Sequence, residues 1–144
     1  MAINNTVVTT STMDSLIGGY RAHVLGRPLP NPVSLQFTPS GKEVAVQPEG
    51  GLDTVRHLSN ILVWAYTLTD VTARWWHTND DRLHVSVRGR TAGGVRMLVY
   101  GGCVFADCLG LVALDRGQDE RVTLDEIYTL VGLLREAQPD RGAA

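Results

Sequence analysis

The chain has 144 residues, of which 44% are hydrophobic and 19% charged, and its formal net charge is −2. This composition is typical of a folded globular domain and excludes a disordered chain. Its apolar runs are far shorter than the roughly 20 residues that cross a bilayer, so we expect no membrane partner. The charge is uneven, because residues 1–106 carry a net +2 and residues 107–144 a net −4.

The N-terminal stretch 1–11 is rich in Asn, Thr and Ser, and we expect a flexible arm there. It has no basic segment followed by an apolar run, which is the pattern of a signal peptide, so we expect a cytoplasmic protein. A helix is predicted next, because apolar residues recur at helical spacing between 13 and 24 and Gly26 follows. Gly18 and Gly19 lie inside this helix, where close packing against another segment is the usual reason for glycine.

The next elements are a hairpin and a second helix. Residues 33–38 and 43–47 alternate apolar and polar side chains around the turn sequence Pro-Ser-Gly-Lys, which predicts a β-hairpin. Residues 52–67 form a second predicted helix. Its wide apolar stripe includes Trp64, so we expect it to be the most buried helix.

Three more strands and a last helix complete the chain. Segments 69–77, 82–91 and 95–104 alternate in the strand pattern and are joined by short turns. A further extended piece is expected at 109–113. The last helix has a clear start signal, because Thr123 and Glu126 have the spacing of a capping box.

These elements predict one α+β domain over residues 12–138 and a C-terminal tail over 139–144. Their order is α-ββ-α-βββ-α. Because short turns join most of the strands, we expect an antiparallel meander sheet with the helices packed on one face.

The strand 82–90 has one apolar face and one basic face. Its residues Leu83, Val85 and Val87 alternate with polar side chains in the sequence RLHVSVRGR. If these three side chains face the helices, alternation in the two neighbouring strands brings Arg and aromatic side chains to the opposite face. We predict that this face is a binding surface made of Arg74, Trp76, His84, Arg88, Arg96 and Tyr100.

More than one occupant suits such a face. Trp, Tyr and Arg are the usual anchors of protein interfaces, so we favour a protein partner, with self-association as a homodimer first. Nucleic acid is an alternative, because Arg binds phosphates and aromatic rings stack on bases. The negative net charge disfavours it. The face could instead be plainly solvated, or covered by the acidic residues Asp115, Asp119 and Glu120.

The other reactive residues carry no diagnostic motif, so we assign no catalytic residue, metal site or cofactor. Cys103 and Cys108 are expected to be small buried thiols. His77 and His84 lie across a turn that contains two aspartates, but two histidines fall short of the three or four ligands of a zinc site. We therefore predict a non-catalytic adaptor or regulatory protein, with a small enzyme or ligand-binding protein as the remaining alternative.

Twelve of its thirteen basic residues are Arg, as in GC-rich coding, which suggests a high-GC bacterium or one of its phages.

Overall fold

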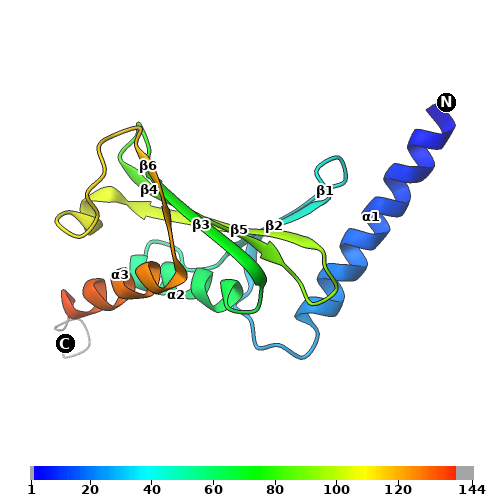
Figure 1. Cartoon of the computed structure of the whole chain (residues 1–144). Helices are drawn as coiled ribbons and strands as arrows, with labels where there is room; N and C mark the ends of the chain where they lie inside the picture. The colour runs from blue at the N-terminus through cyan, green and yellow to red at the C-terminus, as the bar shows by residue number, and fades with distance from the viewer. Residues whose placement is uncertain (1, 139–144) are drawn as a thin grey trace.

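This computed structural model describes residues 2–138, with side chains from residue 10 onward. Figure 1 shows a curved sheet with two helices packed beneath it and a long helix that projects from one end. The sheet has six strands in the order β1-β2-β5-β4-β3-β6. In chain order the elements are α1 Ala2–Val24, β1 Pro32–Thr38, β2 Glu43–Pro48, α2 Thr54–Ala65, β3 Thr69–His77, β4 Arg82–Arg90, β5 Arg96–Val104, the short 3-10 helix η1 Phe105–Cys108, β6 Asp119–Val122 and α3 Leu124–Glu136.

Helix α1 begins at Ala2, so residues 2–11, predicted as a flexible arm, are helical. The prediction followed from the many Asn, Thr and Ser residues of this stretch. Each of them costs less than about 0.7 kcal/mol relative to Ala in a helix, and a cost of this size is easily overridden. The C-terminal half of α1 is anchored to the domain. The Tyr20 ring stacks on Trp64 of α2 at 6.4 Å and meets Phe37 of β1 edge-on at 5.8 Å. Leu16 is buried as well.

The sheet is mixed, so the prediction of an antiparallel meander was only partly right. Strands β3, β4 and β5 do form the expected meander, with antiparallel pairing throughout. The hairpin β1–β2, however, joins this meander through a parallel pairing of β2 with β5. Helix α2 carries the chain beneath the sheet from the end of β2 to the start of β3, so the two halves meet without a local turn.

The sixth strand, β6, was missed. It pairs with the outer edge of β3 in antiparallel register, and Val122 lies opposite Ala73. Its sequence Asp-Glu-Arg-Val contains three charged residues in four, so it lacks the alternation by which strands are recognised. No strand forms at 109–113, where an extended piece was predicted, because residues 109–111 form a turn directly after η1.

The core lies between the sheet and helices α2 and α3. The alternation predicted for β4 is confirmed, since Leu83, Val85 and Val87 are fully buried on the helix side. Both helix starts follow their sequence signals. Asp53 caps α2 by accepting from the Arg56 amide at 3.1 Å, and Thr123 starts α3 with a complete capping box.

The predicted tail 139–144 lies outside the described residues. Within residues 2–138, no helix combines the length and apolar character needed to span a membrane.

The two glycines of α1 have different surroundings, and this difference can be tested. A Cβ on Gly18 would meet nothing within 4 Å, whereas a Cβ on Gly19 would lie 2.3 Å from the Cγ2 atom of Val95. We expect Gly18→Ala to raise the free energy of unfolding by roughly 0.5–1 kcal/mol through helix propensity. Gly19→Ala should lower it by about 1 kcal/mol, because the stiff Val95 side chain must move. Urea denaturation of both variants measures this, and equal stabilisation would show that α1 does not press on Val95.

Candidate functional site

The outward face of the sheet is the face opposite α2 and α3. Strand register places Tyr100, Ser86 and Arg74 in one row across β5, β4 and β3. His84 and Trp76 form the next row, followed by Asp119 of β6. The predicted inward and outward assignments of these three strands are therefore correct.

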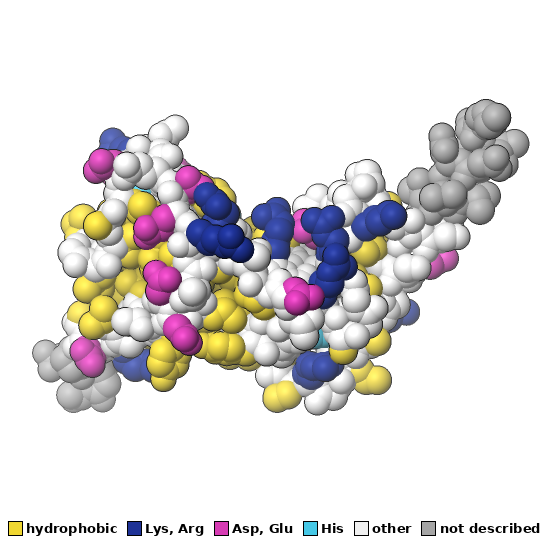
Figure 2. Space-filling model, viewed as in Figure 1, with side chains coloured by type: hydrophobic (Ala, Val, Ile, Leu, Met, Phe, Trp, Pro, Cys, Tyr) yellow, Lys and Arg dark blue, Asp and Glu magenta, His cyan; other side chains and the backbone are white. Residues whose placement is uncertain are grey.

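This face is hollowed. The curved sheet encloses a hollow of about 610 Å³, which we call the concave hollow. Figure 2 shows the upper surface dipping between its two ends, with Lys and Arg side chains along both sides of the dip. The lining residues are Gln36, Ala45, Arg74, Trp76, His84, Ser86, Arg88, Leu98, Tyr100, Gly117 and Asp119.

Five of the six predicted site residues line the concave hollow. The sixth, Arg96, lines a separate hollow at the α1 end of the sheet. Sequence reasoning also missed the far wall, which Gln36 and Ala45 contribute from the β1–β2 hairpin. No local sequence pattern predicts the parallel pairing that brings this hairpin beside β5.

Three aromatic rings form a ladder across the strands in the concave hollow. The Trp76 and His84 rings stack with centroids 4.0 Å apart and an interplanar angle of 29°. The His84 and Tyr100 rings follow at 6.1 Å and 12°. The rings therefore turn their faces toward one another along the ladder. Both faces of the His84 ring and one face each of Trp76 and Tyr100 are used in these stacks.

Arginines flank this ladder, and each of the two in the concave hollow has a carboxylate beside it. Arg74 Nε donates to Asp119 at 3.1 Å, and Arg88 Nε donates to Glu43 at 3.3 Å. Both arginine side chains remain about half exposed, at 51% and 52%. Exposed ion pairs of this kind are weak, so an occupant can compete for the guanidinium groups.

Up to residue 138, where the described chain ends, the acidic C-terminal part borders the hollow without covering it. Asp119 lies on the outward face beside Arg74, whereas Glu120 accepts from Trp75 Nε1 at 2.7 Å, one residue along the strand. Asp115 is not among the residues that line the hollow. Of the three acids that were considered as a cover for the face, Asp119 lies on it, at its edge.

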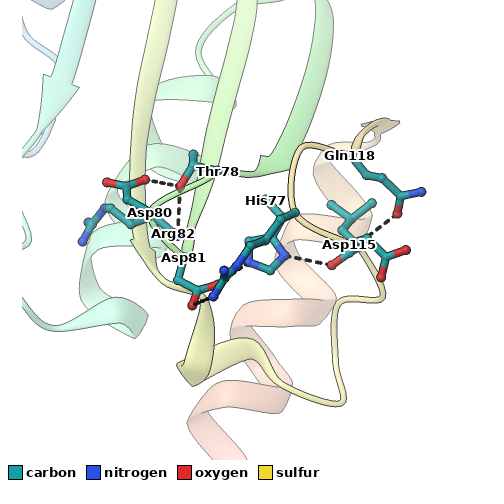
Figure 3. Close-up of polar contacts among 9 residues, drawn as sticks. His77, Thr78, Asp80, Asp81, Arg82, Asp115 and Gln118 are labelled. Atoms are coloured by element: carbon teal, nitrogen blue, oxygen red, sulfur yellow. Dashed lines mark hydrogen bonds and ion pairs between the residues drawn. The ribbon is translucent and has the colours of Figure 1, made fainter.

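One wall of the hollow depends on Asp81, in the turn between β3 and β4. Its carboxylate accepts from Arg116 Nε at 2.9 Å and lies 2.8 Å from His77 Nε2, while the other ring nitrogen of His77 lies 2.9 Å from the Leu114 carbonyl oxygen. Figure 3 shows His77 between the turn and the 114–118 loop. These contacts hold the loop that leads through Gly117 to Asp119.

This clamp predicts a pH dependence. Hydrogen bonds from Arg116, and then from His77, lower the pKa of Asp81 from 3.8 to about 2. A carboxyl group whose pKa is lower in the folded chain than in the unfolded chain stabilises the fold at pH values above its ordinary pKa. This stabilisation is lost as the pH falls toward 2. We expect Asp81→Asn to flatten the dependence of unfolding free energy on pH between 4 and 2, measured by urea denaturation. The control is Asp70→Asn, another aspartate with positive φ, and an equal effect of both substitutions would contradict the role of the clamp.

Burial against the neighbouring rings lowers the pKa of His84, and the charge of Arg82 lowers it further. The unfolded chain therefore binds more protons near pH 6.5, and His84 makes the fold less stable as the pH falls below that value. We expect Trp76→Ala to raise the pKa of His84 toward 6.5 by admitting water, as followed by NMR titration. Tyr128→Ala removes an exposed aromatic ring from α3 and should leave the His84 titration unchanged.

The remaining reactive groups lie away from the concave hollow. His77 is buried against Phe105 on the helix side, so it and His84 occupy opposite faces of the sheet. Among the described residues, no group of three or more His, Cys, Asp or Glu side chains could hold a metal ion. Cys103 and Cys108 are buried as predicted, with their sulfur atoms 3.7 Å apart.

Comparison with protein-family models, curated proteins and solved structures finds no match to this chain.

Proposed function

We propose that this protein is a non-catalytic adaptor or regulatory protein that binds an acidic segment of a partner protein in the concave hollow. The observation that carries the proposal is the composition of the hollow. Leu98, Ala45 and the aromatic ladder supply an apolar floor, and Arg74 and Arg88 stand half exposed beside it. Protein interfaces commonly combine buried aromatic anchors with arginine in this way.

The two half-exposed arginines of the hollow favour an acidic occupant. Arg74 and Arg88 already bind carboxylates of this chain, which shows the geometry they offer to Asp or Glu side chains of a partner. A second copy seated face to face would bring the arginines of one chain against those of the other. We therefore place a different, acidic chain in the hollow. Homodimer formation stays a prediction that the experiment below also tests.

The aromatic ladder makes nucleic acid the less suitable occupant. Bases bind to aromatic side chains by stacking on exposed ring faces. In the ladder, His84 lies between Trp76 and Tyr100, and the ring faces are turned toward one another. A base could stack between these rings only by separating them. An extended acidic peptide can lie over the ring edges and reach the arginines without this cost.

The experiment titrates poly-L-glutamate into the full chain and follows tryptophan fluorescence. We expect the substitution pair Arg74→Gln and Arg88→Gln to weaken binding by about tenfold, since an ion pair of a half-exposed arginine contributes up to about 1 kcal/mol. The matched control pair is Arg56→Gln and Arg135→Gln, which removes the same charge from the helix side. Equal weakening by both pairs would show nonspecific attraction and overturn the proposal.

Two further measurements distinguish the other occupants. If oligothymidylate binds more tightly than poly-L-glutamate, requires Trp76, and weakens linearly with the logarithm of salt concentration, the hollow is a nucleic-acid site. If light scattering shows an oligomer that Trp76→Arg dissociates and Tyr128→Arg does not, a second copy occupies the hollow. Either result would replace the acidic partner.

A further inference from the structure

A second hollow, of about 590 Å³, lies where α1 meets the end of the sheet. Three segments that are distant in sequence build it: helix α1, the turn between β1 and β2, and the ends of β4 and β5 with the turn that joins them. In Figure 1 the β4–β5 turn lies beside the C-terminal half of α1. We call this the α1 hollow, and its lining residues are Ser11, Thr12, Ser15, Leu16, Lys42, Arg90, Gly94, Val95 and Arg96.

Helix α1 contributes hydroxyl groups to the α1 hollow. Ser11 and Ser15 are four residues apart, as are Thr12 and Leu16, so helical geometry puts all four on neighbouring positions of one face. Gly19 continues this face and has no side chain to separate α1 from Val95. The close approach at Gly19 thus brings the hydroxyl-bearing turns of α1 toward the basic end of the sheet.

The opposite wall of the α1 hollow is basic. Arg90 and Arg96 are directly opposite each other in the antiparallel pair β4–β5, and Lys42 joins them from the β1–β2 turn. Among the described residues, none of these three side chains forms an ion pair with a carboxylate. The nearest acid in register, Glu43, lies opposite Arg96 on β2 but turns its carboxylate to Arg88.

This arrangement is unfavourable in the absence of a ligand. Like charges directly opposite each other in a strand pair destabilise a sheet. Lys42 in addition has a φ of 51°, a left-handed backbone conformation that an L-residue other than glycine or asparagine rarely adopts. Features that cost stability commonly gather at functional sites.

We propose that the α1 hollow binds a phosphate-bearing small molecule. A phosphate group carries up to two negative charges and several acceptor oxygens, and it is best satisfied by guanidinium, ammonium and hydroxyl donors together. The hollow has all three kinds of donor. Arg90 Nη1 donates to the Gly94 carbonyl oxygen at 3.0 Å, which orients its guanidinium at the rim. The volume is within the range of sites for ligands of nucleotide size.

The test is calorimetric titration of the full chain with sodium tripolyphosphate and with ATP, in chloride buffer at constant ionic strength. We expect both to bind, and Arg96→Gln to weaken the binding about tenfold, the loss expected from one charge-assisted contact. Arg56→Gln is the control, because it removes the same charge from helix α2, away from both hollows. Tighter binding of ATP than of tripolyphosphate identifies a nucleotide, and equal binding identifies the phosphate chain alone as the recognised group.

A second variant tests the contribution of α1 without changing the charge. Gly19→Val should push the helix away from Val95 and weaken tripolyphosphate binding severalfold, under conditions where circular dichroism shows the chain to be folded. Absence of binding at millimolar tripolyphosphate would overturn the proposal. Equal losses for Arg96→Gln and Arg56→Gln would also overturn it, because they would show attraction by the overall charge. None of these outcomes depends on what occupies the concave hollow.

Discussion

The parallel pairing of β2 with β5 is the constraint on which both hollows depend. On the inward side of the sheet, this pairing places Val44 beside Met97 and Val46 beside Val99. All four side chains are fully buried on the side where α2 packs. Burying them stabilises the fold by roughly 1.5–3 kcal/mol per side chain. On the outward side, the same register adds Ala45 to the concave hollow and brings the β1–β2 turn, with Lys42, beside Arg96.

Alternate residues of each strand form the core on one face of the sheet and the concave hollow on the other. Because successive side chains point to opposite faces, residues such as Val85 and Val99 build the core while their neighbours His84 and Tyr100 build the ladder. A shift of one residue in any of these strands would bury arginine and expose valine. The core therefore holds the outward residues in register, and the concave hollow needs no separate scaffold.

The basic residues of the outward face fall into two regions, and helix α1 borders one of them. Its anchoring at Tyr20 fixes its C-terminal half against Trp64, and Gly19 lets it approach the β4–β5 turn. The helix thereby gives Arg96 different surroundings from Arg88, although the two lie on adjacent strands of the same face. One region offers an apolar floor with paired arginines, and the other offers hydroxyl groups with cations that have no carboxylate partner among the described residues.

The sequence by itself determined the features that depend on local patterns. Strand periodicity located β3, β4 and β5 and assigned their outward residues, and the capping box at Thr123 located the start of α3. Tertiary structure alone decided the β2–β5 pairing, the addition of β6 at the edge, and the separation of Arg96 from the other predicted site residues. These features arise between segments far apart in the chain. Their energy comes from burial against α2 and from edge pairing, and the periodicity of a strand does not specify the strand with which it pairs.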